Sequence, residues 1–184
     1  MRTRLVLGLL LLAVPALAAS KAGVKLPDTV DVGGKTLTLN GIGLRTKLVI
    51  DVYVAGLYLP AKESSPEKIL AADEPRRMVM HFLYSVSKKQ IAEAWEEGLK
   101  ANVPGAADAV KRDFTTLSGW MEPIRKGQTL VITYVPGEGS RVEVNGKAKG
   151  TLAGKATADA ILATWIGPKP GPGPRFRRNL LGQK

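Results

Sequence analysis

The order in which two hydrophobic periods follow each other limits the folds this chain can adopt. Alternation typical of strands occupies residues 23–59, returns at 76–86 and again at 128–152, whereas helical spacing marks 65–72, 87–103, 110–121 and 157–165. Glycine turns join neighbouring strands, and Gly33-Gly34 and Asn145-Gly146 are hairpin signals. Antiparallel hairpins with segregated helices predict an α+β fold rather than a wound parallel sheet.

The most apolar β-type run extends from Leu44 to Leu59, is rich in Val, Ile and Tyr, and ends at Pro60. We expect a turn before it, at residues 40–43, and a single long strand through it. Such a length predicts a bend or bulge near Ala55-Gly56.

Both ends of the chain have distinct compositions. Residues 1–19 combine Arg2 and Arg4 with an apolar core and a small-residue cleavage site, which is the pattern of a secretory signal. We therefore expect a cleaved signal over 1–19, a mature start near Ala19 or Ser20, and a periplasmic or secreted protein. Residues 20–184 then form a single domain, whose end from 167 onward is a Gly/Pro-rich linker followed by a basic tail, Arg175–Lys184.

Composition removes several functional classes. The chain has no cysteine and one histidine, so it predicts no thiol nucleophile, no usual zinc site and no iron–sulfur cluster. We expect neither a metal nor a cofactor. The net charge of +11 suits an anionic partner. Export and the lack of a dense basic run with interleaved aromatics argue against nucleic acid.

The usual catalytic motifs are also missing from the sequence. It contains no G-x-S-x-G and no H-E-x-x-H, and Gly41-Ile42-Gly43 lacks the third glycine of a dinucleotide fingerprint. His81 is predicted on the strand face opposite Phe82 and Tyr84, where a solvent-facing or packed histidine is favoured over a general base.

Arg45 and Tyr53 are the best candidates for a binding site. They are separated by an even number of residues in the predicted strand, so both project from one face unless a bulge intervenes. A guanidinium supplies two parallel donors and a phenol a third, a set that can hold a carboxylate. The alternative is that Arg45 is solvated and pairs with Asp51.

Residues 41–47 and 52–59 together resemble the chalcone isomerase family, and more closely its bacterial exported, chalcone isomerase-like branch. Residues 88–95, 129–146, 165–168 and 179–182 agree with the same family. The resemblance covers roughly residues 22–182. It implies an open-faced β-sandwich, in which a large antiparallel sheet carries helices layered on one face and a ligand cleft lies between.

The resemblance also suggests roles for individual positions. Arg45 occupies the position of the arginine in chalcone-cyclising members, and their threonine position is Tyr53. Their catalytic tyrosine position is Ile91 and their asparagine position is Gly98. Neither residue has a side chain that can donate a hydrogen bond to a substrate oxygen. The fatty-acid-binding branch keeps the arginine and has a tyrosine in place of the threonine, as in the pair Arg45 and Tyr53.

The leading hypothesis is therefore non-catalytic binding of a fatty acid or similar amphiphilic, anionic carboxylate. Arg45 and Tyr53 are predicted to hold the headgroup; the residues predicted to line the tail channel are Met78, Met80, Phe82, Tyr84 and Trp95. One alternative is an isomerase or intramolecular lyase acting on a chalcone-like or enone substrate. Another is an interaction module whose basic tail contacts an anionic envelope surface.

Overall fold

The computed structural model describes residues 18–183. The predicted signal segment lies outside the described residues as far as residue 17, and so does Lys184. The predicted mature start, Ala19 or Ser20, falls inside β1 (Ala18–Lys21), the first strand of the described part. Within residues 18–183, no helix combines the length and the apolar character that crossing a bilayer requires.

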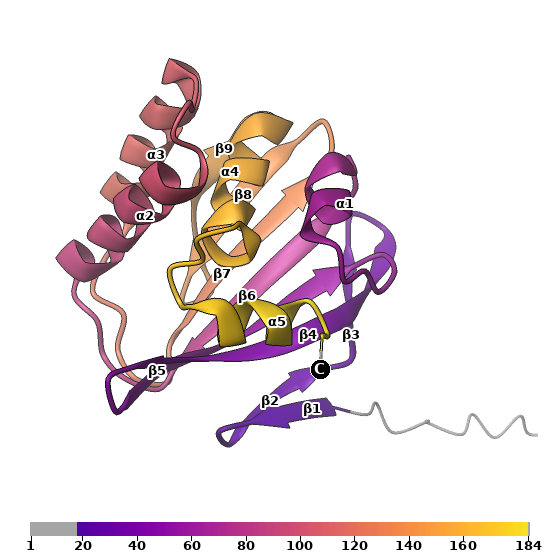
Figure 1. Cartoon of the computed structure of the whole chain (residues 1–184), viewed down its shortest axis with the longest axis vertical. Coiled ribbons are helices and arrows are strands. Elements are labelled where there is room, and N and C mark those ends of the chain that lie inside the picture. Colours follow the sequence, from indigo (N-terminus) through magenta and orange to yellow (C-terminus); the bar gives the residue numbers. More distant parts are fainter. Residues whose placement is uncertain (1–17, 184) are drawn as a thin grey trace, which may run out of the picture.

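A seven-stranded antiparallel sheet carries the helices on one face, and a separate hairpin of β1 and β2 lies against the other (Figure 1). The sheet order is β3-β4-β5-β6-β7-β8-β9, so every neighbour in space is also a neighbour in sequence. This is the predicted α+β, open-faced architecture. The remaining strands are β2 (Val24–Pro27), β3 (Thr29–Val32), β4 (Lys35–Lys47), β5 (Ile50–Leu59), β6 (Arg76–Phe82), β7 (Thr129–Val135), β8 (Gly139–Val144) and β9 (Lys147–Leu152).

Local sequence signals account for where the first helices begin. The Ser65 hydroxyl accepts a hydrogen bond from the Lys68 amide at the start of α1, and Ser87 and Gln90 form a reciprocal capping box at the start of α2. The helices are α1 (Pro66–Ala71), α2 (Lys88–Asn102), α3 (Asp108–Trp120), α4 (Lys155–Ile166) and α5 (Pro174–Leu180).

Strand alternation divides the buried residues between the two faces of the sheet. Leu57 and Met80 belong to the large cluster under the helices, whereas Val54 and Tyr58 belong to a smaller cluster under the β1–β2 hairpin. The main core therefore lies between the sheet and the helices, and a cleft between these two layers lies on the same side of the sheet.

The prediction of one long strand over Leu44–Leu59 is wrong. The chain reverses at Leu48-Val49, so the run divides into the end of β4 and the whole of β5. Residues 40–43 are not a turn but lie inside β4, and the register shifts occur at Asn40 and Val52 rather than near Ala55-Gly56. The Asn40 side chain donates to the carbonyls of Glu63 and Leu180, which stabilises the first irregularity.

The prediction of a linker and a basic tail from residue 167 is also wrong in part. Residues 167–172 form no helix or strand, as expected for their Gly and Pro content, but α5 follows and is part of the core. Phe176, Leu180 and Leu181 are each at most 1% exposed. Arg177 donates through Nε to the Ile166 carbonyl at 2.7 Å. The basic residues at the C-terminus thus lie on an integral helix.

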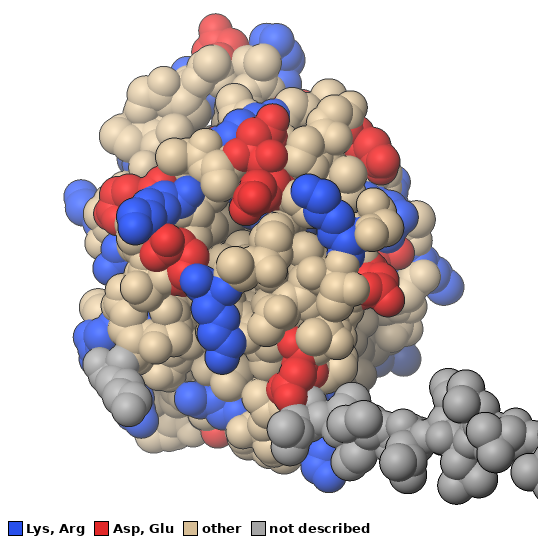
Figure 2. Space-filling model, turned by 90° about the vertical axis from the view of Figure 1, so that its right-hand side faces the viewer, with Lys and Arg blue, Asp and Glu red and all other residues tan. Residues whose placement is uncertain are grey.

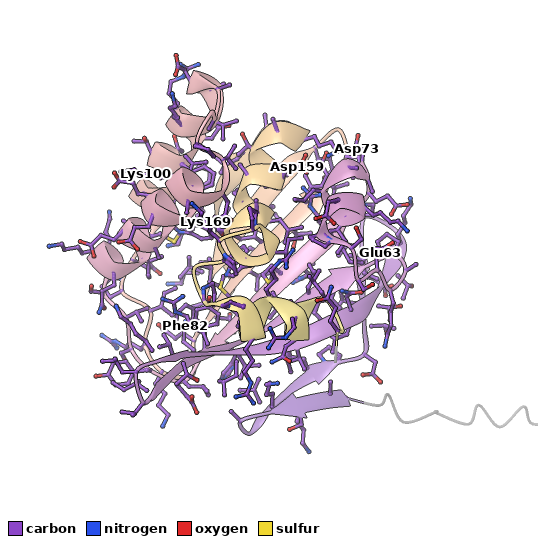
Figure 3. All side chains as sticks on the ribbon, viewed as in Figure 1. Glu63, Asp73, Phe82, Lys100, Asp159 and Lys169 are labelled. Carbon is purple, nitrogen blue, oxygen red and sulfur yellow. The ribbon has the colours of Figure 1, made fainter. Side chains whose placement is uncertain are left out.

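A polar cluster ties α1 and α4 to the sheet (Figure 3). Arg76 is buried, forms an ion pair with Asp159 of α4 and lies over the ring of Tyr134. The Tyr134 hydroxyl donates to Asp73 at 2.6 Å. Because a buried guanidinium is costly unless its donors are satisfied, this cluster orients α4 over β6 and β7.

Basic and acidic side chains alternate on the face that Figure 2 shows, which is the right-hand side of Figure 1. Lys and Arg do not gather there into one basic field. Such mixing is typical of a solvated surface, so the positive net charge does not by itself mark a binding face here.

We expect Gly41→Ala to lower the free energy of unfolding by about 2 kcal/mol, because α5 packs directly on the backbone of β4. A Cβ at Gly41 would lie 2.7 Å from the carbonyl carbon of Leu180, which cannot move without displacing the helix. Gly119→Ala is the control, since nothing lies within 4 Å of its added Cβ. Urea denaturation gives the midpoint of unfolding for each variant. Equal midpoints for Gly41→Ala and Gly119→Ala would contradict the packing of α5 on β4.

Candidate functional site

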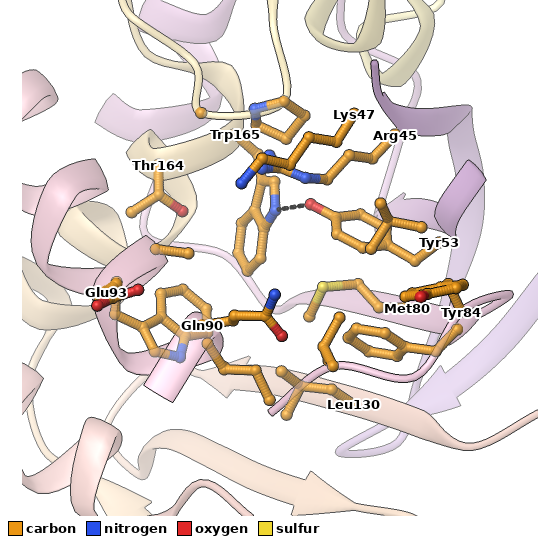
Figure 4. Close-up of a pocket in the computed structure, with 18 of the residues that line it drawn as sticks. Arg45, Lys47, Tyr53, Met80, Tyr84, Gln90, Glu93, Leu130, Thr164 and Trp165 are labelled. Atoms are coloured by element: carbon orange, nitrogen blue, oxygen red, sulfur yellow. Dashed lines mark hydrogen bonds between the residues drawn. The ribbon is translucent and has the colours of Figure 1, made fainter. Parts of the chain in front are cut away.

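A cleft of about 410 Å³ opens between the end of the β4–β5 hairpin, α2 and α4 (Figure 4). Its interior residues are buried and mostly apolar, whereas its rim carries both charges. The interior comprises Tyr53, Met80, Phe82, Ile91, Trp95, Leu130, Thr164 and Trp165, and the exposed rim includes Lys47, Leu48, Ile50, Tyr84, Gln90, Glu93 and Glu97. An apolar interior with a few polar groups at one side is typical of a small-molecule site.

Arg45 and Tyr53 lie directly opposite each other on β4 and β5. Residues opposite each other in an antiparallel pair project from the same face. The prediction that the two share a face is therefore right, but its reason was wrong, since they lie on two strands and not on one. The Arg45 guanidinium carbon lies 6.0 Å from the centre of the Tyr53 ring.

The hydroxyl of Tyr53 is positioned by Trp165 of α4. The indole Nε1 donates to Tyr53 Oη at 3.1 Å, and both side chains are buried. Phe82 and Phe176 contact the ring with centroid separations of 5.4 and 5.8 Å. Because the Tyr53 oxygen accepts this bond, its own proton remains free to donate to a ligand.

Burial raises the pKa of the Tyr53 phenol above its ordinary value of 10.0, and the positive charge of Arg45 and the hydrogen bond from Trp165 partly oppose this effect. The phenol is therefore protonated at neutral pH and is a hydrogen-bond donor.

Arg45 is a partly buried cation without a carboxylate partner in the described chain. No carboxylate oxygen of residues 18–183 lies within 4.0 Å of its guanidinium. Asp51, the alternative partner considered from the sequence, instead accepts a hydrogen bond from the Thr46 hydroxyl at 2.7 Å. The guanidinium thus faces the cleft with donors available.

All six residues predicted as ligand-binding line this cleft: Arg45, Tyr53, Met80, Phe82, Tyr84 and Trp95. Tyr84 differs from the others because it is 52% exposed and lies on the rim, beyond the end of β6. Met78, also predicted for the tail channel, is buried in the core away from this cleft. The ligand-binding role of these residues stays a prediction.

Sequence reasoning missed Trp165, Lys47 and Leu130 as cleft residues. Trp165 ends the helical spacing predicted over 157–165, and periodicity cannot say which strand the apolar face of that helix covers. Lys47 lies two residues after Arg45, and Figure 4 shows the two cations on the same side of the cleft. Alternation along β4 could have indicated Lys47.

The positions of the remaining candidates follow from packing. Ile91 lies in the cleft wall as bare hydrocarbon, and Gly98 is the point where α2 and α4 touch, since a Cβ there would lie 2.9 Å from that of Thr164. His81 lies on the opposite face of β6 from Phe82, as predicted. Among residues 18–183, no cluster of three potential metal ligands is present.

Comparison with known proteins identifies the fold. A family model described as chalcone isomerase-like matches residues 18–182. The crystal structure of an Arabidopsis thaliana fatty-acid binding protein superposes with a TM-score of 0.71 at 19% sequence identity, over 90% of this chain and 96% of the other. No curated protein matches the sequence. At this identity the structural likeness establishes the fold alone.

We expect Tyr53→Phe to lower the free energy of unfolding by about 1–2 kcal/mol, because the buried Trp165 N–H loses its acceptor. Tyr84→Phe is the matched control, since its ring is exposed and its change should stay within about 0.5 kcal/mol. A cycle with Trp165→Phe should show coupling of about 1 kcal/mol between positions 53 and 165. Strict additivity would argue against the hydrogen bond.

The difference in the free energy of unfolding between the wild type and Tyr53→Phe should decrease at alkaline pH. Because the pKa of Tyr53 is raised in the folded protein, the protonated phenol makes its full contribution to the free energy of unfolding below pH 10. Above pH 10 the unfolded chain loses this proton first, so the wild-type advantage should fall by up to about 1.4 kcal/mol per pH unit. Denaturation at pH 8 and pH 11 measures the difference, and an unchanged value would contradict the burial of this phenol.

Proposed function

The chain belongs to the chalcone isomerase-like family, and from that premise we propose that it binds a fatty acid or a similar amphiphilic carboxylate in this cleft. Binding is proposed to be non-catalytic. The fatty-acid binding protein of Arabidopsis thaliana, which shares the fold, supports the ligand class.

The observation that carries the proposal is the pair of Arg45 and Tyr53 at the edge of an apolar interior. A cation without a carboxylate partner lies beside a phenol whose acceptor lone pair is occupied and whose proton is free. A carboxylate placed between them would receive charge-assisted hydrogen bonds from the guanidinium and one from the phenol. Lys47 on the same side adds a second positive charge.

The interior of the cleft suits a hydrocarbon tail. Met80, Phe82 and Leu130 come from the sheet, and Ile91 and Trp95 come from α2. An acyl chain there would replace contact with water by contact with buried carbon, which contributes about 0.8 kcal/mol per methylene. Methionine at position 80 can adapt its rotamer to chains of different shape.

Two positions argue against the alternative reaction, the cyclisation of a chalcone. The resemblance assigns the family's catalytic tyrosine and asparagine to Ile91 and Gly98, and neither can donate to a developing oxyanion. Gly98 also packs closely against Thr164 of α4, so a longer side chain at this position would push α2 and α4 apart.

The proposed setting is the periplasm or the exterior, because residues 1–19 have the composition of a secretory signal. Cell fractionation of the full chain against a chain starting at Ala19 tests this part separately.

We expect delipidated protein to bind palmitate in titrations followed by the fluorescence of Trp95 and Trp165. Arg45→Gln should weaken binding by at least about tenfold, because a charge-assisted hydrogen bond contributes about 1.5–3 kcal/mol. Arg141→Gln is the matched control, since this arginine lies on β8 and does not line the cleft.

Hexadecanol has the same tail without the charge, so wild-type protein should prefer palmitate, and Arg45→Gln should lose that preference. Equal affinity of Arg45→Gln and wild type for palmitate would remove the proposed role of Arg45. Turnover of naringenin chalcone above its spontaneous rate would instead favour the isomerase.

A further inference from the structure

The large hydrophobic side chains that residues 18–183 leave exposed gather at one place. They are Leu48 and Val49, each 93% exposed, Ile50 at 41% and Tyr84 at 52%. Three of them belong to the hairpin tip, defined here as Lys47–Ile50. The ladder between β5 and β6 begins only at Tyr53, so this tip extends beyond the sheet, at the lower left of Figure 1.

Other two-residue hairpin loops of the chain show how unusual this tip is. The loops Ala22-Gly23, Gly33-Gly34 and Asn145-Gly146 have positive φ at both positions and use small or polar residues, as such turns require. The tip uses Leu48-Val49, with φ of 56° at Leu48. Leucine rarely adopts this conformation and gains nothing from full exposure to water, so the residue is unfavourable both sterically and in solvation. Strain that packing does not explain points to function.

The tip is continuous with the proposed ligand site. Leu48, Ile50 and Tyr84 line the mouth of the cleft, and Arg45 and Lys47 lie on the strand that leads into the tip. Exposed aliphatics, a neighbouring lysine and a rim tyrosine are the set found where proteins enter the headgroup region of a bilayer. The acidic residue next to the tip, Asp51, accepts a hydrogen bond from Thr46, and the acidic residues of the cleft rim, Glu93 and Glu97, lie on α2.

We propose that the hairpin tip docks the protein on an anionic lipid bilayer, with Leu48 and Val49 inserted among the acyl chains and Lys47 at the phosphates. Docking in this orientation places the mouth of the cleft against the lipid, so an amphiphile can pass between them without crossing water. That consequence rests on the proposed function, whereas docking itself does not. A second copy of the chain is a poorer occupant, because so small a tip buries far less than the roughly 800 Å² per partner of a stable interface.

The test is cosedimentation of the delipidated full-length protein with vesicles that contain no free fatty acid. Vesicles of about 30 mol% phosphatidylglycerol in phosphatidylcholine are compared with pure phosphatidylcholine. The wild type should bind the anionic vesicles. Leu48→Asn combined with Val49→Gly reproduces the Asn145-Gly146 loop, so it should fold at least as stably while its vesicle partition falls by about tenfold or more.

Two exposed lysines at opposite ends of β4 allow a matched comparison. Lys47→Gln should weaken binding to anionic vesicles by about fivefold. Lys35→Gln removes another exposed lysine beside the Gly33-Gly34 loop, at the other end of β4, and should change partition by less than about twofold. Leu48→Met with Val49→Leu keeps the apolar area and should retain binding.

Undiminished vesicle binding by the Asn-Gly variant, or no binding by the wild type, would overturn the docking proposal. Sedimentation of the protein without vesicles tests whether a second copy of the chain covers the tip. A dimer that the Asn-Gly variant abolishes would assign the tip to self-association instead. Palmitate titration without vesicles separates the two proposals, because docking can fail while ligand binding persists.

Discussion

The register of β4 against β5 at Arg45 and Tyr53 is the constraint on which the rest of the site depends. Direct pairing places a guanidinium and a phenol on the core face of the sheet, and the chain reverses only three residues after Arg45. The site and the exposed tip are consequently two parts of one hairpin end. A shift of one residue in this register would place the two side chains on opposite faces of the sheet.

The C-terminal third of the chain completes the site around that pair. Helix α4 contributes Trp165, which fixes the orientation of the phenol, and α5 contributes Phe176, whose ring packs edge-on against Tyr53. The contact of α5 with the backbone at Gly41 holds this arrangement against β4. A segment whose composition looks like a solvated tail thus closes one wall of the core, and its removal would be expected to unfold the site rather than only alter surface charge.

Local signals predicted much of the fold correctly, because caps and glycine turns act over a few residues. The helix predicted over 87–103, the hairpin at Asn145-Gly146 and the helix predicted over 157–165 all occur as expected. The reversal at Leu48-Val49 was missed since it contains none of the residues that normally mark a turn, and the apolar run continues through it. A functional role for the tip would account for this failure, because residues retained for binding need not agree with local propensity.

The sequence by itself determined the α+β class and the hairpins at Gly33-Gly34 and Asn145-Gly146, and it placed Arg45 and Tyr53 on one face, although for a wrong reason. It also identified six cleft-lining residues, with the family resemblance as a guide. Only the tertiary structure decided that Trp165, 112 residues from Tyr53, would meet the phenol, that α5 would pack into the core, and that Leu48 and Val49 would have no cover. The reason is physical: periodicity reports which face of an element avoids water, whereas the partner of that face is chosen by packing between segments far apart in the chain.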